Sequence, residues 1–217
     1  MQLEELTYAG HSAVLLSAND GTVVGIDPWL EGNPRCPEQL KNPARLDLIV
    51  LTHGHDDHAS DTVRLAKRYG STVAATFELA QLLIGEGVPE QKVVALNRGG
   101  TAKINGLYVT LTTAFHSSSF TTSKGPAYAG EACGAVVGDG KVSVYTMGPA
   151  EAAEAATLLR CKVAIPIHFG TFPGLTGTGA DFVKECTLKE IRSVALEPGS
   201  TYSLREFDRG VKGVPAP

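Results

Sequence analysis

Residues 49–58 have the sequence IVLTHGHDDH, in which four apolar or β-branched residues lead into three histidines and two aspartates. A short apolar run that ends at a turn signal is typical of a buried β-strand. The chain has six histidines, and three of them fall within this stretch. A solvated polar loop, which is the alternative interpretation, gives no reason for that concentration. The stretch therefore predicts a buried strand that ends in a cluster of metal ligands.

The spacing of these side chains favours convergence on a metal ion. His53 and His55 are two residues apart, so in an extended segment their side chains point the same way. Asp57 and His58 follow at the expected start of a helix, where the chain changes direction. Imidazole and carboxylate groups together suit zinc and the neighbouring first-row divalent metals.

The spacing His-x-His-x-Asp-His after an apolar strand resembles the metallo-β-lactamase superfamily. Three more segments, 26–29 (IDPW), 113–118 (TAFHSS) and 167–172 (IHFGTF), resemble one branch of it, the small prokaryotic metal-dependent hydrolases related to ascorbate-6-phosphate lactonases. The resemblance runs from Leu3 to Leu204. It implies an αββα sandwich, in which two mixed β-sheets pack face to face with helices on the outer faces. Residues 1–217 would form this one hydrolase domain.

The resemblance implies six metal ligands in two groups. The first metal position would use His53, His55 and His116, and the second would use Asp57, His58 and His168. The pattern of the chain agrees, because five of the six histidines end an apolar strand or lie in the turn after one. Taken alone, His116 and His168 would be read as core histidines rather than as ligands.

Three other residues could support the ligands. His11 lies in Gly10-His11-Ser12, which resembles a segment of the same branch, and it is either a pocket or second-layer residue or a histidine of a surface turn. Asp27 ends its strand before Pro28. It could orient a ligand histidine through the second ring nitrogen, or it could cap a loop. Asp56 would point away from the metals if Asp57 points toward them.

The implied chemistry is metal-assisted hydrolysis. Two divalent metal ions would lower the pKa of a shared water, so that hydroxide is available near neutral pH, and would polarise the substrate oxygen. Zinc is the expected metal, and manganese, iron and nickel also fit these ligands. Asp57 could also take a proton from the nucleophile. The expected substrate is a small ester, lactone or phosphoester.

Hydrophobic periodicity and turn residues predict the other elements. Strands are expected over 3–8, 13–17, 22–26, 46–51, 72–75, 92–96, 102–104, 107–113, 132–137, 141–145, 162–167, 193–196 and 201–204. Helices are expected over 60–69, 77–84, 149–159 and 180–186. Residues 28–43 and 117–130 are expected to be loops that shape the pocket. In them, Arg35 and Lys124 could meet an anionic group.

Composition narrows the classes of partner. The chain has 217 residues, of which 43% are hydrophobic, and a net charge of −4. The isoelectric point is about 5.9. A surface without an excess of basic residues does not favour nucleic acid as a partner.

The sequence contains neither a long apolar run nor a leader with a charged and then an apolar part. A cytoplasmic location without membrane association is therefore expected. The four cysteines lack metal-ligand spacing and are expected to be free thiols. A small-molecule substrate is expected, and a homo-oligomer is compatible with the sequence.

One departure from the resembled branch follows residue 145. That branch carries a Gly-Asp-Thr turn there, whose aspartate bridges the two metals, and then a helix and a strand. In this chain Tyr145 is followed directly by Thr146-Met147-Gly148. Either the segment belongs to the protein and is missing from the 217 residues, or the deletion is real. A real deletion would leave two positions with three ligands each and would favour a second function, a non-catalytic metal-binding or sensing domain.

Overall fold

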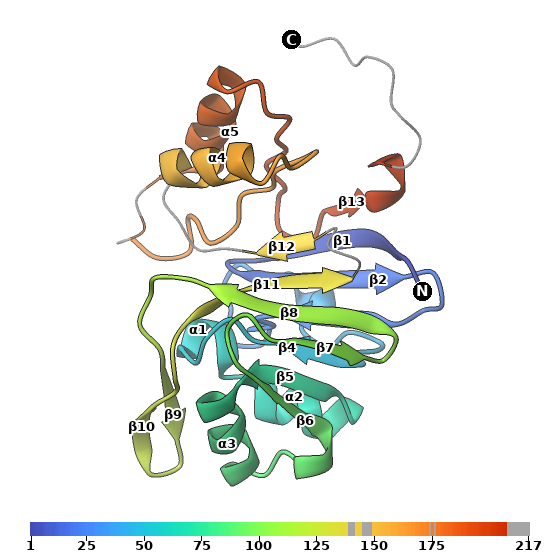
Figure 1. Ribbon diagram of the computed structural model, residues 1–217, viewed down its shortest axis with the longest axis vertical. Helices are drawn as coiled ribbons and strands as arrows, with labels where there is room; N and C mark the ends of the chain where they lie inside the picture. The colour runs from blue at the N-terminus through green and yellow to red at the C-terminus, as the bar shows by residue number, and fades with distance from the viewer. Residues whose placement is uncertain (139–141, 145–148, 174, 176, 208–217) are drawn as a thin grey trace.

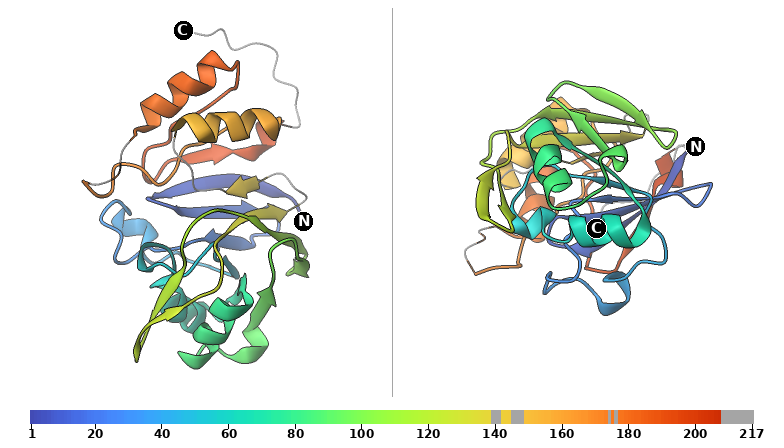
Figure 2. Two further views of the ribbon diagram at one scale, coloured as in Figure 1. Left: turned by 60° about the vertical axis from the view of Figure 1, so that its left-hand side comes forward. Right: turned by 90° about the horizontal axis from the view of Figure 1, so that it is seen from below.

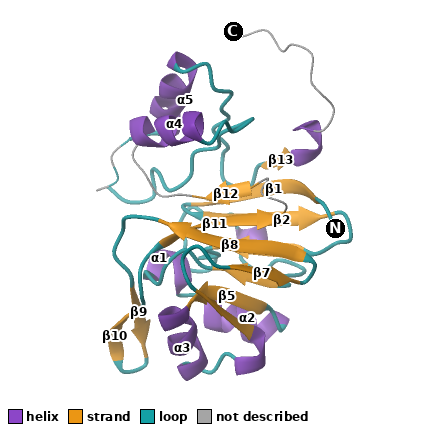
Figure 3. Ribbon diagram, viewed as in Figure 1, coloured by secondary structure: helices purple, strands orange, loops and turns teal. Residues whose placement is uncertain are grey.

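The computed structural model describes residues 1–138, 142–144, 149–173, 175 and 177–207, with only the backbone at 142–144 and 206–207 (Figure 1). Within this part of the chain, two sheets pack face to face. Figure 2 shows the sheets from two further sides, and Figure 3 distinguishes the strands from the helices that flank them. The architecture is the α/β sandwich that was expected from the sequence.

The larger sheet is mixed. Its seven strands have the order β13-β1-β2-β3-β4-β5-β6. Pairing is antiparallel from β13 to β3 and parallel from β3 to β6. The strands are β1 (Leu3–Gly10), β2 (Ala13–Ala18), β3 (Val23–Ile26), β4 (Leu48–Val50), β5 (Thr72–Thr76), β6 (Val93–Leu96) and β13 (Thr201–Ser203).

The smaller sheet is antiparallel over its described strands and has the order β12-β11-β8-β7. A separate hairpin lies at its side, formed by β9 and β10. The strands are β7 (Thr101–Ile104), β8 (Leu107–Thr113), β9 (Ser119–Thr122), β10 (Gly125–Tyr128), β11 (Cys133–Gly138) and β12 (Val142–Val144).

Helices flank the sheets. They are α1 (Asp56–Ala59), α2 (Thr62–Tyr69), α3 (Phe77–Gly85), α4 (Pro149–Leu158) and α5 (Gly179–Leu188), with 3-10 turns at Glu38–Leu40, Glu90–Lys92 and Leu204–Phe207. Helices α2 and α3 lie beside β5 and β6, and α4 and α5 lie together beyond β12 (Figure 1). None of the described helices is both long and apolar enough to cross a bilayer.

Two apolar clusters hold these layers together. One lies between the sheets and joins residues such as Leu16 and Val50 to Leu111 and Val137. The other lies between the large sheet and its helices and joins Ile49 to Leu65, Leu79 and Leu83, among others. Alternate residues of β4 thus belong to opposite clusters, which explains why Leu48, Ile49 and Val50 are all apolar and fully buried. The strand that carries the metal motif is therefore packed on both faces.

The topology brings several strand ends to one edge of the large sheet. Strands β1, β3 and β4 run in the same direction, because β2 is antiparallel to both β1 and β3 and because β3 and β4 are parallel. Their carboxyl ends lead into His11, Asp27 and residues 53–58, respectively. Side chains on loops at one edge of a rigid scaffold can form a binding site.

Two sequence predictions were wrong in this part of the fold. Residues 162–167 and 193–196 are not strands, and they share only the isolated parallel bridge Ala164↔Ser193. Their apolar side chains still pack against the core between the sheets, through Val163, Ile165 and Val194. An apolar sequence pattern predicts that a segment is buried. A β-strand also needs a neighbouring strand with which it can form a ladder of backbone hydrogen bonds.

The loop expected over 117–130 was also wrong in part, since it contains the β9–β10 hairpin. Its Ser, Thr and Gly residues are typical of loops, and only the tertiary structure shows that β9 and β10 pair with each other.

The four cysteines are free, as expected, and three of them are buried. The proposed break between Tyr145 and Thr146, and the last ten residues, lie outside the described part of the chain.

The turn between β7 and β8 gives a stability prediction. Gly106 has φ +84°, a conformation that favours glycine, whereas Gly85 at the end of α3 has no positive φ and has open space around it. We expect Gly106→Ala to lower the free energy of unfolding by about 1 kcal/mol. Gly85→Ala, the matched control, should leave stability unchanged or raise it by up to about 1 kcal/mol. Urea denaturation of both variants measures the difference, and equal effects would contradict the assignment.

Candidate metal centre

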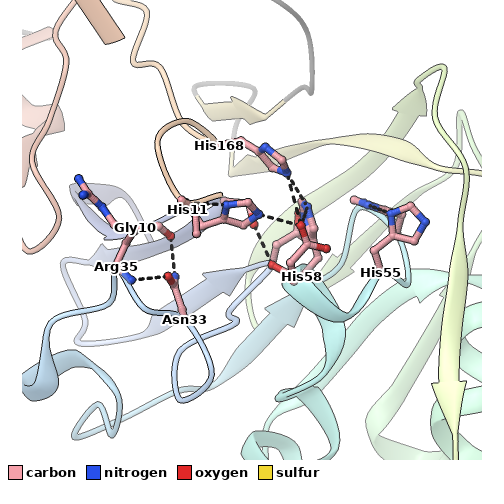
Figure 4. Close-up of polar contacts among 12 residues, drawn as sticks. Gly10, His11, Asn33, Arg35, His55, His58 and His168 are labelled. Carbon is pink, nitrogen blue, oxygen red and sulfur yellow. Dashed lines mark hydrogen bonds and ion pairs between the residues drawn. The ribbon is translucent and has the colours of Figure 1, made fainter. Parts of the chain in front are cut away.

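All six histidines of the chain gather at one edge of the sandwich. They come from the end of β1, the β4–α1 connection, the segment after β8 and the segment before α5. Figure 4 shows His11, His58 and His168 turned toward one another, with His55 beside them. Residues separated by more than 150 positions therefore share one site.

The first cluster consists of His53, His55 and His116, whose potential ligand atoms lie within 4.8 Å of one another. The His53 ring centre is 4.6 Å from that of His55 and 4.9 Å from that of His116. Exposure increases outward, because His53 is buried, His55 is half-buried and His116 is exposed. The cluster is thus open to solvent on the His116 side.

The loop of the first cluster is held by the β9–β10 hairpin. A Cβ atom on Gly54 would lie 2.8 Å from both the Ser119 carbonyl oxygen and the Ala129 Cβ. The Gly54 N–H donates to Ser118 Oγ at 3.2 Å. The glycine between the two histidines is therefore required by close packing, which the sequence pattern did not reveal.

The second cluster consists of Asp57, His58, His168 and His11, again with ligand atoms within 4.8 Å. His58 Nε2 is 3.2 Å from His168 Nε2 and 3.9 Å from Asp57 Oδ2. The grouping of Asp57, His58 and His168 is the one that the sequence suggested. The two clusters adjoin, since the His53 and His58 ring centres are 4.0 Å apart.

Asp27 connects both clusters to the core. Its carboxylate is 1% exposed and accepts three hydrogen bonds, from the Thr52 N–H (2.8 Å), the Thr52 hydroxyl (2.6 Å) and His58 Nδ1 (2.8 Å). A neutral His58 that carries its proton on Nδ1 presents an unprotonated Nε2 to the site. The contact with His58 has the geometry by which a carboxylate can orient a ligand histidine through its second nitrogen.

Thr52 extends this network to His53. Because its hydroxyl proton is directed to Asp27, Thr52 Oγ1 accepts from His53 Nδ1 at 2.9 Å. The Nε2 atom of a neutral His53 is then unprotonated, and it lies 3.1 Å from His55 Nδ1. No role for Thr52 was expected from the sequence. A buried hydroxyl directly before the first histidine was the available signal.

His11 forms a similar chain to the second cluster. It is fully buried, so the surface-turn interpretation was wrong. Its Nε2 lies 2.9 Å from Asp57 Oδ2, and its Nδ1 lies 2.9 Å from Thr171 Oγ1. Because Asp57 is an ionised acceptor, Nε2 donates to it, and a neutral ring then accepts from the Thr171 hydroxyl. Thr171 is the second residue that sequence analysis did not assign.

Charges at the site are set by burial and by the neighbouring histidines. Burial, together with His58, lowers the pKa of His53 to about 3, and burial with His11 lowers the pKa of His168 to about 4. Burial and His55 also lower the pKa of His116. Burial would raise the pKa of Asp57, but the hydrogen bond from His11 holds it below its ordinary value. At neutral pH His53, His116 and His168 are thus neutral imidazoles, and Asp57 is an ionised carboxylate.

Three of the six non-glycine residues that have a positive φ in the described part of the chain lie at this site. His11, Asp27 and His168 have φ values of +55°, +44° and +65°, in the left-handed region that non-glycine residues rarely adopt. The turn at His11 is fixed by backbone contacts, since the His168 N–H donates to its carbonyl and Asn33 Nδ2 donates to the Gly10 carbonyl (Figure 4). Strain of this kind persists where the surrounding structure holds it, and it clusters at functional sites.

Other candidates lie away from the clusters. Asp56 is exposed and accepts from the Thr121 hydroxyl, so it does not face the metal ligands. The Arg35 side chain points away from the histidines (Figure 4). Lys124 is exposed in the turn of the β9–β10 hairpin.

The donor set fits divalent metal ions. Ligands about 2 Å from one zinc ion lie within about 4 Å of each other, so a small contraction of each cluster would complete a site. The Nε2 atoms of the buried His53 and His58 each lie within hydrogen-bond distance of another ring nitrogen, on His55 and His168 respectively. Neutral imidazoles with opposed nitrogens are the arrangement that a cation would stabilise.

The histidine pKa values give a pH prediction for protein stripped by a chelator. An unfolded histidine has a pKa of about 6.5. As pH falls below that value, the unfolded chain takes up protons that folded His53 and His168 do not, so the free energy of unfolding should decrease down to about pH 4, by about 1.4 kcal/mol per pH unit for each group. Urea denaturation at a series of pH values measures this decrease in the free energy of unfolding.

The control is the range above about pH 7.5, where both histidines are neutral in the folded and in the unfolded state and contribute no pH dependence. Constant stability in the acid range would contradict the assignment.

Comparisons with known proteins agree with this geometry. A family model described as "Beta-lactamase superfamily domain" matches residues 22–148, more than half of the chain. A UPF0173 metal-dependent hydrolase of Koribacter versatilis is 35% identical over 234 residues, covering 92% of this chain and 97% of that protein. One from Myxococcus xanthus is 40% identical over 238 residues, covering 92% of this chain and 83% of that protein.

These alignments are longer than the 217 residues of this chain, so both relatives contain residues without a counterpart here. This difference in length agrees with a segment that the relatives contain and this chain lacks.

Two solved structures are similar in fold. Igni18, described as a novel metallo hydrolase from the archaeon Ignicoccus hospitalis, superposes with a TM-score of 0.79 at 29% identity, covering 94% of this chain and 99% of its own. The metallo-β-lactamase fold protein YhfI from Bacillus subtilis gives a TM-score of 0.63 at 14% identity, covering 93% of this chain and all of its own. Together with the histidine clusters, these similarities show that the chain belongs to the metallo-β-lactamase superfamily, among the UPF0173 metal-dependent hydrolases.

Proposed function

We propose that this protein hydrolyses a small ester, lactone or phosphoester with two divalent metal ions, zinc being the expected metal. The observation that carries the proposal is the gathering of all six histidines and two carboxylates at one edge of the sandwich. Histidines used only for packing would have no reason to come together from four separate segments of the chain. Their lowered pKa values also keep His53, His116 and His168 available as neutral ligands.

The two clusters suggest how the ions would be held. His53, His55 and His116 would bind one, and Asp57, His58 and His168 would bind the other. Bound ions would lower the pKa of water toward neutrality and polarise the substrate oxygen. Because the two clusters share the contact between the His53 and His58 rings, both ions would lie close to one substrate.

The protein side chains supply orientation and a proton acceptor. Asp57 is ionised at neutral pH and can accept a proton from the attacking water. His11 donates to Asp57 and limits its rotation, and Thr171 fixes the His11 ring in turn. Asp27 and Thr52 keep His53 and His58 in the tautomers that direct Nε2 to the site. A small-molecule substrate and a cytoplasmic location are part of the proposal.

A non-catalytic metal-binding or sensing domain is the second candidate. The observation that favours it is the length of the relatives' alignments, because a segment absent from this chain could include the bridging aspartate. Such a domain would bind metal without turnover of any ester, lactone or phosphoester. Sequence alone makes a third candidate, a nuclease, unfavourable because the chain is acidic.

Elemental analysis tests the two-metal assignment. We expect close to two metal ions per wild-type chain and a lower content in the His55→Ala/His116→Ala variant, because both changed side chains belong to the first cluster. Chelator treatment should abolish hydrolysis of 4-nitrophenyl acetate, a phosphodiester and a lactone, and the matching metal should restore it. Undiminished activity in the double variant would sink the hydrolase assignment. Metal binding without turnover of any of the three would favour the second candidate.

Asp27→Asn tests the orienting role. The amide cannot accept from both Thr52 and His58 as the carboxylate does, so we expect metal affinity to fall by about 10- to 100-fold. Chelator competition measures the affinity. Asp47→Asn is the matched control, because Asp47 also accepts a backbone hydrogen bond, from Val23, and lies outside both clusters. Equal affinities in the two variants would show that Asp27 does not act on the ligands.

A further inference from the structure

Two aromatic side chains flank the second cluster. The ring centres of Trp29 and Phe172 each lie 5.4 Å from that of His11, and both meet the imidazole edge-on. The two aromatic rings are 6.0 Å from each other. We call this pair the aromatic wall. Through His11, which contacts Asp57, it is continuous with the candidate metal centre.

The wall is held in place but remains accessible. Phe172 is 41% exposed and Trp29 is half-buried. Phe172 directly follows Thr171, whose hydroxyl bonds to His11. The Trp29 indole lies over Gly32, where an added Cβ would come within 2.7 Å of Nε1. Large aromatic surface that stays exposed beside a reaction centre can bind an apolar part of a ligand.

The charge of the site favours a neutral substrate. In the part of the chain that the structure describes, no lysine or arginine forms an ion pair with a residue of either cluster. Arg35, one of the two cationic candidates from the sequence, points away (Figure 4). Among the described residues, the ion pairs of both clusters thus involve only histidine and aspartate, which favours an uncharged substrate over a phosphoester.

We propose that Trp29 and Phe172 bind the aromatic or aliphatic group of an uncharged carboxylic ester or lactone. This rests on the proposed function and narrows its substrate class. In the reaction, the oxygen of water bonds to the carbonyl carbon, the bond to the alcohol oxygen breaks, and the alcohol leaves with a proton from that water. The wall positions the apolar group while the clusters act on the carbonyl.

Binding can be measured without turnover, because Trp29 is the one tryptophan in the chain. Benzyl methyl ketone has the shape of phenyl acetate but cannot be hydrolysed. We expect it to change the fluorescence of Trp29 saturably in metal-loaded protein, whereas acetone should not. In Phe172→Ala the ketone should bind about tenfold more weakly, from loss of an aromatic contact.

Two further variants serve as comparison. Gly32→Ala should also weaken binding, since its methyl group displaces the indole without touching the clusters. Tyr108→Ala is the matched control, because Tyr108 is likewise about half exposed but lies at the far end of β8 from His116. It should bind the ketone as wild-type protein does. Equal affinity in all of these proteins, or no saturable signal, would overturn the proposal.

Kinetics then separate this proposal from the proposed function. Phe172→Ala should raise KM for phenyl acetate about tenfold more than it raises KM for methyl acetate, whereas Tyr108→Ala should leave KM for both esters unchanged. Chelator-sensitive hydrolysis that does not discriminate phenyl from methyl esters would refute the aromatic wall and leave the hydrolase intact. Saturable ketone binding without hydrolysis of any ester would support the wall and count against the hydrolase.

Discussion

The hydrogen bonds of the buried Asp27 carboxylate determine the geometry of both histidine clusters. A buried carboxylate is costly unless its oxygens are hydrogen-bonded, and three donors from Thr52 and His58 meet that requirement. The same bonds place the protons of His58 and His53 on Nδ1. The Nε2 atoms are thereby left as acceptors toward the site. One network thus satisfies a buried charge and leaves two histidines with unprotonated Nε2 atoms toward the site.

This arrangement depends on where Asp27 lies in the sheet. Strand β3 ends beside β4, so the carboxylate that ends one strand meets the backbone N–H and the hydroxyl of Thr52 that end its neighbour. The positive φ of Asp27 directs the side chain inward, and β4, packed on both faces, gives the strand end little freedom to shift. Strain at Asp27, His11 and His168 is compensated by the packing of the layers around them.

The second cluster links chemistry to recognition. His11 contacts Asp57 on one side and the rings of Trp29 and Phe172 on the other. In the proposed reaction, this position of His11 would couple the placement of an apolar ligand to that of the proton acceptor Asp57. Trp29 lies in the loop after β3, and Phe172 lies in the segment after His168. Changes in these two loops can therefore alter a substrate preference without moving the side chains at the strand ends.

Local pattern in the sequence determined the superfamily resemblance, most of the strands and the six expected ligands, because a strand followed by His-x-His-x-Asp-His constrains both backbone and chemistry. It could not determine that His11 is buried, since a Gly-His-Ser turn has the same pattern at the surface and in the core. It also gave Thr52 and Thr171 no role, because hydroxyl groups show their partners only when distant segments meet. The strands expected at 162–167 and 193–196 failed for the same reason. Whether an apolar run forms a ladder depends on the neighbour that tertiary structure places beside it.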